Sequence, residues 1–255
     1  MFVDTHAHLT DKAFDGKIDQ VIKRSKEMGV EKIVTSSVDL RSSIESTRLA
    51  AQFDEVYSSI GIYPEYIYDW DKTLCNQLAS LATQNKVVAI GEIGLQFTDG
   101  MPDRESQQNV LKEQLHLAYE LKLPVILHCR EAYGAMLDLL KEEKAAIKYG
   151  AAMHCYSGSK EIAKELLKLG IYISVGGVST FKNALSLKET LKSVPNEMIL
   201  FETDCPYLAP HPYRGQINEP SFIPTIAENL AHLKEMEVEE LALIVRENTR
   251  RLLKI

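Results

Sequence analysis

The sequence has few of the features that mark exported, membrane or fibrous proteins. Its 255 residues include only four cysteines and 13 glycines, and 45% of them are hydrophobic. These values exclude a disulfide scaffold, a collagen and a disordered chain, and are typical of a globular protein. No run approaches the roughly 20 apolar residues of a membrane span, and no basic segment followed by an apolar stretch opens the chain. We therefore expect a cytoplasmic protein without a membrane partner.

Two further absences concern binding sites. No C-x-x-C pair occurs, which argues against a zinc ribbon or a thioredoxin-type redox site, and no G-x-G-x-x-G suggests a dinucleotide site. Positive charge is also scarce, since 29 Lys and Arg stand against 36 Asp and Glu, a net charge of -7. This charge argues against a protein that coats duplex DNA, but it does not exclude a nucleic-acid substrate held at one local site.

Short strand-like runs alternate with longer stretches of helical period along the whole chain. The expected strands are Phe2–Val3, Lys32–Ser36, Val56–Ile60, Val87–Gly91, Val125–His128, Ala151–His154, Ile171–Gly176 and Met198–Thr203. Helices are expected near 18–28, 42–52, 71–85, 110–121, 133–147, 159–169 and 183–193, with two more in 220–253. Eight such repeats predict an α/β fold, a TIM (β/α)8 barrel that forms one domain over residues 1–255. An open doubly wound sheet is the alternative.

Potential metal ligands stand at the ends of five of these strands. His6 and His8 follow the first strand and are two residues apart, so on extended backbone both rings point to the same side. The remaining ligands, at the ends of the fourth, fifth, sixth and eighth strands, are Glu92, His128, His154 and Asp204. In a barrel all these strand ends meet at one mouth, where active sites are built.

The chemistry of this set indicates a metal centre. Four imidazoles and two carboxylates favour Zn²⁺, Mn²⁺ or a similar ion over an all-oxygen Mg²⁺ or Ca²⁺ site. Six ligands are too many for one tetrahedral site with an open position, and suit two ions roughly 3.5–4 Å apart with a carboxylate between them. The same two-residue alternation places Arg130 and Glu202 on the side of the site, and turns Cys129, Cys155 and Cys205 away from it.

The motifs around these residues resemble those of a known family. The chain contains, in this order between Asp4 and Pro220, D-T-H-A-H, G-E-I-G-L, P-V-I-L-H-C-R-E-A, H-C-Y-S-G, E-T-D-C-P-Y-L-A-P and P-Y-R-G-Q-I-N-E-P, and the match runs from residue 3 to about residue 253. Together they resemble the TatD family of metal-dependent deoxyribonucleases, within the wider amidohydrolase group of barrels. The resemblance implies two divalent cations (Zn²⁺, Mn²⁺ or Mg²⁺), one held by His6, His8, Glu92 and Asp204 and the other by Glu92, His128 and His154.

One position departs from the family pattern. The family usually continues G-E-I-G-L with Asp and an aromatic residue, whereas this chain has Gln96 and Phe97. A glutamine keeps the capacity for hydrogen bonds but removes the charge. We therefore expect metal binding to be retained, and a change in ligand orientation, in substrate contact or in activity.

The resemblance implies hydrolysis of DNA phosphodiester bonds by a metal-activated water, with 3′-5′ exonuclease-like polarity. We expect Asp204 and Glu92 to be catalytic, Asp204 as the proton acceptor, and Arg130, Arg214 and Asn218 to contact the phosphate. The alternatives are a hydrolase of a small ester, lactone, amide or aminoacyl ester, and an inactive metal-binding barrel. A phosphodiester cleft should be long and lined with Arg or Lys, whereas a small-molecule pocket should be closed and partly apolar. No obligate protein partner is evident.

Overall fold

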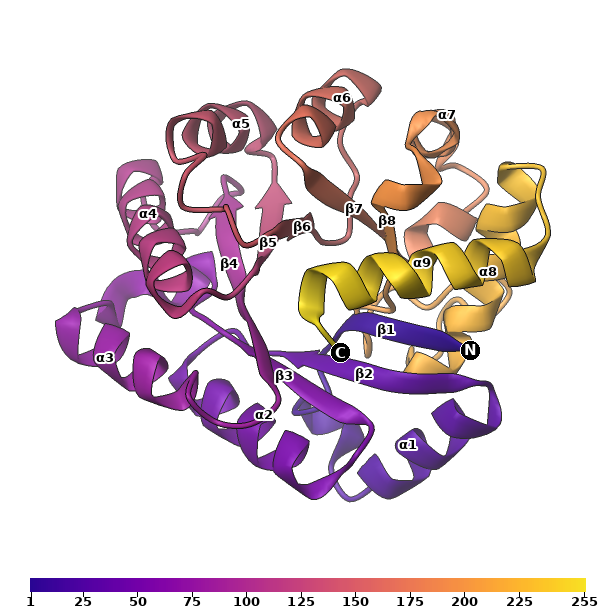
Figure 1. The fold of residues 1–255 in the computed structure, drawn as a ribbon, viewed down its shortest axis with the longest axis horizontal. Helices are drawn as coiled ribbons and strands as arrows, with labels where there is room; N and C mark the ends of the chain where they lie inside the picture. The colour runs from indigo at the N-terminus through magenta and orange to yellow at the C-terminus, as the bar shows by residue number, and fades with distance from the viewer.

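A computed structural model describes all residues from 1 to 255. Eight parallel strands lie in the order β1 to β8 and form a nearly closed barrel (Figure 1). The strands are β1 Phe2–Ala7, β2 Val30–Ser36, β3 Val56–Ile60, β4 Val87–Gln96, β5 Val125–Arg130, β6 Ala151–Met153, β7 Ile171–Val175 and β8 Ile199–Phe201. The expected TIM barrel is confirmed. The largest difference is in β4, which runs past Gly91 and carries Glu92 inside the strand.

Nine α-helices surround or cap the barrel (Figure 1). They are α1 Ile18–Glu27, α2 Leu40–Gln52, α3 Lys72–Leu81, α4 Arg104–Leu121, α5 Tyr133–Glu142, α6 Lys160–Lys168, α7 Leu185–Ser193, α8 Ile223–Leu233 and α9 Val238–Leu253. The side chains of Asp39, Asp71 and Asp103 cap α2, α3 and α4 by accepting a hydrogen bond from a backbone N–H of the first turn. None of the nine helices is long and apolar enough to cross a membrane.

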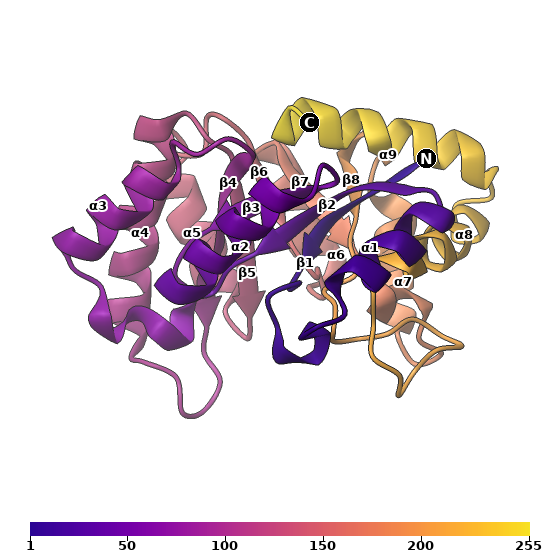
Figure 2. The same cartoon turned by 90° about the horizontal axis from the view of Figure 1, so that it is seen from below.

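The end of the barrel where the strands begin is closed by the last helix. Figure 2 shows α9 lying across the end of the molecule that holds the N-terminus. Leu252 and Leu253 of α9 are buried and join one hydrophobic cluster with residues of the barrel wall, namely Val34, Val88, Ala89, Ile126, Ala152 and Leu200. A second cluster of 54 buried residues forms the main core. A ligand can therefore enter the barrel only from the opposite end, where the strands finish.

The gap between β1 and β8 is held by side-chain and loop contacts. Asp4 is fully buried and accepts hydrogen bonds from the backbone N–H of Thr203 at 3.0 Å, from the Thr203 hydroxyl, and from the backbone N–H of His6 at 3.2 Å. The backbone N–H of Asp204 donates to the carbonyl of His6 at 2.9 Å. These contacts bring Asp204 beside the His6 end of β1.

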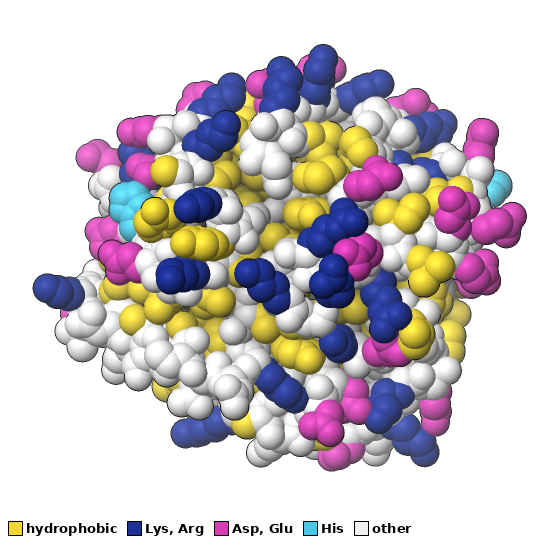
Figure 3. Space-filling view, in the orientation of Figure 1, with side chains coloured by type: hydrophobic (Ala, Val, Ile, Leu, Met, Phe, Trp, Pro, Cys, Tyr) yellow, Lys and Arg dark blue, Asp and Glu magenta, His cyan; other side chains and the backbone are white.

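The face that carries α9 is rich in basic side chains. Figure 3 shows Lys and Arg spread over this face. Helices that return from strand ends point their carboxyl termini here, and cations are favoured at helix carboxyl termini. Basic residues in the last turns include Arg24, Lys141, Lys168 and Arg250. The basic character of this face therefore has a structural origin, on the side away from the ligand-bearing strand ends.

Candidate active site

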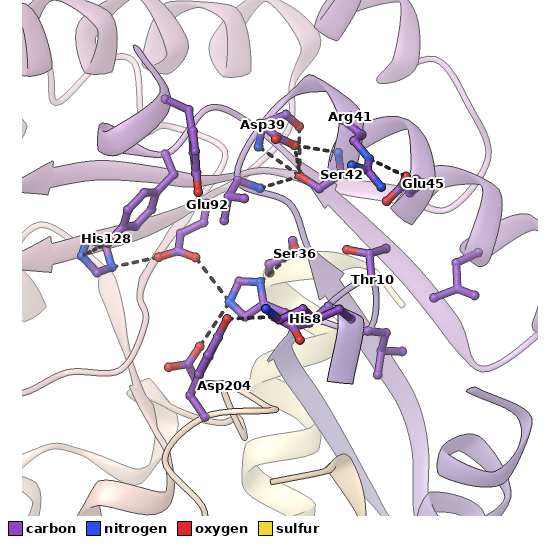
Figure 4. A pocket seen from close by; sticks show the side chains of 18 of the residues that line it. His8, Thr10, Ser36, Asp39, Arg41, Ser42, Glu45, Glu92, His128 and Asp204 are labelled. Carbon is purple, nitrogen blue, oxygen red and sulfur yellow. Dashed lines mark hydrogen bonds and ion pairs between the residues drawn. The ribbon is translucent and has the colours of Figure 1, made fainter. Parts of the chain in front are cut away.

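Glu92 lies at the centre of the cluster of expected ligands. Figure 4 shows its carboxylate between His128 on one side and His8 with Asp204 on the other. Oε2 of Glu92 is 3.3 Å from Nε2 of His6 and 3.6 Å from Nε2 of His8. Oδ1 of Asp204 is 3.2 Å from the same nitrogen of His8. These four residues come from β1, the residue directly after it, β4 and the segment after β8, and they form one half of the cluster.

The second half of the cluster uses the other oxygen of Glu92. Oε1 of Glu92 is 2.8 Å from Nδ1 of His128 and 2.9 Å from Nε2 of His154. The two histidine nitrogens are 3.0 Å apart. Glu92 is 3% exposed, so its two oxygens face two separate pairs of imidazoles in a nearly dry environment. The structure thus brings together all six ligands expected from the sequence.

The outward-facing Nδ1 atoms of His6, His8 and His154 differ in their partners. Nδ1 of His8 is 3.1 Å from the carbonyl oxygen of Ser36, which can only accept, so this nitrogen carries the proton. Nδ1 of His6 is 3.1 Å from the hydroxyl of the same serine. Nδ1 of His154 has no hydrogen-bond partner within the usual limit and lies 3.7 Å from Oε1 of the fully buried Glu202. In its neutral form His8 therefore offers the lone pair of Nε2.

Electrostatics keep both carboxylates ionised. Burial opposes the ionisation of Glu92, but attraction to His154 and the close contacts with His128, His154 and His6 outweigh it and hold its pKa well below the usual range. Burial likewise opposes ionisation of Asp204, yet the contact with His8 and the nearby imidazoles lower its pKa. A buried and a half-buried negative charge at one point require positive charge beside them.

The donor set fits divalent cations. Glu92 belongs to two groups of three residues, one with His6 and His8 and one with His128 and His154, and within each group the ligand atoms lie within 4.8 Å of one another. Imidazole nitrogens and carboxylate oxygens are ligands that Zn²⁺ and Mn²⁺ accept. The orientation of the rings, with their lone pairs towards the carboxylates, agrees with such a role.

A cavity of about 1140 Å³ opens directly above this cluster. It continues outward between the segment after β1 and the exposed side of α2. Four basic residues line it, namely Lys12, Arg41, Arg48 and Arg130. Of these, only Arg41 has an ion-pair partner, Glu45 at 2.9 Å. The cavity exceeds the usual range for small-ligand pockets, roughly 300–1000 Å³.

Acidic residues also line the cavity, and most of them have structural roles. Asp11 accepts a hydrogen bond from the backbone N–H of Ala13 and another from the hydroxyl of Tyr207 at 2.9 Å. Asp39 caps α2 and Glu45 is paired with Arg41. Asp15 and Glu65, by contrast, make no ion pair. The free charges of the outer cavity are therefore Lys12, Arg48 and Arg130 against Asp15 and Glu65.

Two of the three expected phosphate-binding residues do not reach the cavity. Arg130, the last residue of β5, lines it, and its guanidinium is free of other partners. Arg214 instead lies over the ring of Phe181, 4.1 Å from its centre, and is absent from the lining. Asn218 is fully buried, and its amide donates to the carbonyls of Thr203 and Tyr207. The phosphate contacts expected of Arg214 and Asn218 stay predictions, and in this structure the amide of Asn218 holds the loop after β8 in its conformation.

Sequence reasoning missed two residues that orient the ligands. Ser36 ends β2 and contacts both His6 and His8, and Tyr63 follows β3 and contacts Nε2 of His128 at 3.2 Å. Burial raises the pKa of Tyr63, so its hydroxyl remains protonated at neutral pH and donates to Oε1 of Gln96. Both residues stand at strand ends, so the rule that located the ligands, applied to the second and third strands, would have found them.

Comparison with known proteins agrees with this geometry. The family model described as TatD related DNase matches residues 3–254. The chain belongs to the TatD family. It is 42% identical to a metal-dependent hydrolase of Bacillus subtilis, YabD, over the full length of both chains. It is also 34% identical to the 3′-5′ ssDNA/RNA exonuclease TatD of Klebsiella pneumoniae, with 98% of this chain and 96% of that protein covered.

Solved structures of TatD proteins share the same barrel. The crystal structure of YJJV, a TatD homologue of Escherichia coli, superposes with a TM-score of 0.95 at 30% identity and covers 100% of this chain and 98% of that one. A TatD family hydrolase of Entamoeba histolytica gives a TM-score of 0.88 at 25% identity, with coverages of 99% and 97%. The expected family, fold and metal-dependent hydrolase function are thus confirmed.

Proposed function

We propose that this TatD protein is a metal-dependent nuclease that hydrolyses phosphodiester bonds of single-stranded DNA from the 3′ end. The observation that carries the proposal is the cavity of about 1140 Å³, whose lining includes both the ligand cluster and residues of α2. Three cations without protein partners, Lys12, Arg48 and Arg130, stand along it and can contact successive phosphates. The similarity to an exonuclease named for ssDNA and RNA supports the same substrate class.

We further propose that the 255 residues act as one catalytic domain with two divalent cations. His6, His8, Glu92 and Asp204 would hold one ion, and Glu92, His128 and His154 the other, as the division of contacts between the two oxygens of Glu92 supports. When bound, such ions lower the pKa of a coordinated water and polarise the bond to be cut. Zn²⁺ and Mn²⁺ match the four imidazoles better than Mg²⁺ does.

The remaining roles fall to side chains of the chain itself. Asp204 is ionised, and its Oδ1 faces the cluster beside His8, so it can accept a proton from the attacking water. Glu92 joins the two halves of the cluster and fixes their separation. Arg130 lies at the mouth with a free guanidinium, which can hold a phosphate with two parallel hydrogen bonds.

One observation favours a second candidate function. Asp15 and Glu65 line the outer cavity without ion-pair partners, and unpaired carboxylates there would attract an ammonium group. A substrate with an ester bond and a free amine, such as an aminoacyl ester, would satisfy them. This hydrolase of small esters remains the alternative.

The deciding experiment compares two substrates at equal concentrations of metal-loaded protein. A single-stranded DNA labelled at its 5′ end reports both cleavage and polarity, and a generic aminoacyl ester reports the alternative. We expect shortening of the DNA from the 3′ end and little ester turnover. Ester turnover without DNA cleavage would contradict the nuclease proposal and favour the ester hydrolase. An RNA strand of the same sequence tests whether the protein distinguishes DNA from RNA.

Variants of the ligand cluster test the assignment of roles. Asp204→Asn should lower kcat by about 10²–10⁴-fold, the usual contribution of a general base, while the fold is kept. Asp103→Asn is the matched control, because Asp103 caps α4 outside the cavity and asparagine caps a helix as well as aspartate does. Full activity of Asp204→Asn, or an equal loss in the control, would contradict the assignment.

A further inference from the structure

His128 presents a different nitrogen to the cluster from the other three histidines. Its Nδ1 faces Glu92 at 2.8 Å, whereas His6, His8 and His154 all turn Nε2 towards the carboxylates. A neutral imidazole has one protonated nitrogen and one with a free lone pair. Nδ1 of His128 can therefore bind a cation only if the proton is kept on Nε2. The partner of Nε2 decides this.

That partner is the side-chain amide of Gln96. Its Oε1 lies 3.0 Å from Nε2 of His128 and also accepts a hydrogen bond from the hydroxyl of Tyr63. Its Nε2 donates to the hydroxyl oxygen of Thr98 at 2.9 Å, so the carbonyl end of the amide is the end that faces the ring. The carbonyl oxygen can only accept, and the proton of His128 is thus drawn to Nε2.

Gln96 is itself held firmly in place. It is the last residue of β4 and is 7% exposed. Its backbone N–H donates to Oε1 of Gln107 at 2.8 Å, and its carbonyl accepts from Nε2 of Gln107 at 2.8 Å. Gln107 lies in α4 and is also buried. The acceptor that orients His128 therefore has little freedom to move.

The two halves of the cluster differ in negative charge. The half that contains His6 and His8 includes Asp204 and one oxygen of Glu92. The half that contains His128 and His154 has the other oxygen of Glu92 as its one expected carboxylate ligand. Glu202 lies behind His154 at 3.7 Å, whereas the acceptor behind His128 is a neutral amide. A carboxylate behind a ligating histidine makes the ring a stronger donor to a metal, and an amide does so less.

Building on the proposed metal centre, we propose that Gln96 is a positioning residue that keeps the proton of His128 on Nε2 and leaves Nδ1 free for the second cation. Because Gln96 carries no charge, the cation held by His128 and His154 is also bound more weakly than the cation held by His6 and His8. The protein then binds its two cations in separate steps, and the cation at this position exchanges more readily with solution.

The direct test is a metal titration of Gln96→Glu. This substitution keeps the size of the side chain. One oxygen of the new carboxylate can accept from Tyr63 and His128, as Oε1 of Gln96 does. The other oxygen can accept from the hydroxyl of Thr98, which here accepts from the amide. Metal-free protein is titrated with Co²⁺ and followed by calorimetry and visible absorption. We expect the second binding step to tighten by about tenfold or more, and the first to change far less.

A second variant and a control complete the test. Gln96→Met removes the acceptor and should weaken the second step by about 10–100-fold. Gln52→Glu adds the same charge at the end of α2, where Gln52 also lines the cavity, and should leave both steps unchanged. If the second Co²⁺-binding step were unchanged in Gln96→Glu, or tightened equally in Gln52→Glu, the role of Gln96 would be overturned while the two-ion centre would still stand. A wild-type stoichiometry of one Co²⁺ would overturn the proposed two-ion centre as well.

Discussion

Gly94 is a position in β4 that leaves no room for a side chain. A Cβ atom added there would lie 1.9 Å from the carbonyl oxygen of His128 and 2.7 Å from its carbonyl carbon. Ordinary contacts begin at 3.4 Å, so Gly94→Ala must separate the two strands locally by about 1.5 Å, the difference between 3.4 and 1.9 Å. The atoms in conflict belong to the backbone of β5, where Gly94 pairs with His128, and no side-chain rotation relieves them.

The cost of this displacement falls on both stability and activity. Overpacking of a core costs about 1–3 kcal/mol, which for a chain of this length lowers Tm by roughly 2–12 °C. The same shift moves His128 relative to Glu92, and a misplacement of about 1 Å can reduce catalysis 10²-fold. We expect Gly94→Ala to lose metal content and about two orders of magnitude in kcat/KM, measured by metal analysis, thermal melting and DNA cleavage.

Gly134→Ala is the matched control. A Cβ atom at Gly134, in α5, meets no atom within 4 Å, and alanine favours a helix over glycine by about 0.5–1 kcal/mol. The control should therefore keep its metal and activity, with an equal or slightly higher Tm. If Gly94→Ala melted like the wild type and kept its metal, the steric reasoning about β4 and β5 would be refuted.

Three further predictions concern the metal centre and its surroundings. Metal cations present at about 1000 times their Kd stabilise the folded protein by roughly 4 kcal/mol, so their removal by a chelator should lower Tm by roughly 8–16 °C. Added metal should restore Tm, and an unchanged melting curve would contradict the metal site. Glu202→Gln removes the carboxylate nearest Nδ1 of His154 and should weaken metal binding about tenfold in a chelator competition; equal affinity would exclude this role. Cys129→Ala should leave metal content unchanged, because Cys129 belongs to the hydrophobic core, and a loss of metal would show that it faces the site.

The gathering of the six expected ligands at one place could be predicted from the sequence because it depends on the periodicity of the strands. Strand runs locate the carboxyl ends of the strands, and barrel closure brings these ends together whatever the loops do. All eight strands were expected, and His6, Glu92 and Asp204 meet as that rule requires. Alternation along the strand also placed Cys129 and Cys205 in the core, where both are buried.

The loop after β8 could not be predicted in the same way. Its conformation depends on tertiary contacts, such as the amide of Asn218 that bonds two carbonyls and the ring of Phe181 that receives Arg214. Both residues are polar and stand in a family motif, which suggested substrate contact. Composition does not distinguish a polar residue that binds a phosphate from one that satisfies buried backbone groups.

The role of Gln96 was hidden by the length of β4. The sequence run of apolar residues ends at Gly91, but the strand continues through Gln96, which pairs with Arg130 of β5. One glycine, Gly94, and two buried polar residues, Glu92 and Gln96, interrupt the hydrophobic pattern of this extension. The strand persists because β5 and α4 supply hydrogen bonds to it, which a pattern of single residues does not reveal.

The net charge of the chain is a poor guide to its substrate because the charges are distributed by structure. Helix carboxyl termini gather basic residues on the face of α9, and helix amino termini face the mouth, where they favour anions. Two of the excess acidic residues are the expected ligands Glu92, which is buried, and Asp204, which is half-buried, and bound cations would neutralise their charge. The charge that a substrate meets would then be set by bound metal, by helix ends and by Lys12, Arg48 and Arg130 against Asp15 and Glu65, and a polyanion is compatible with a chain of net charge -7.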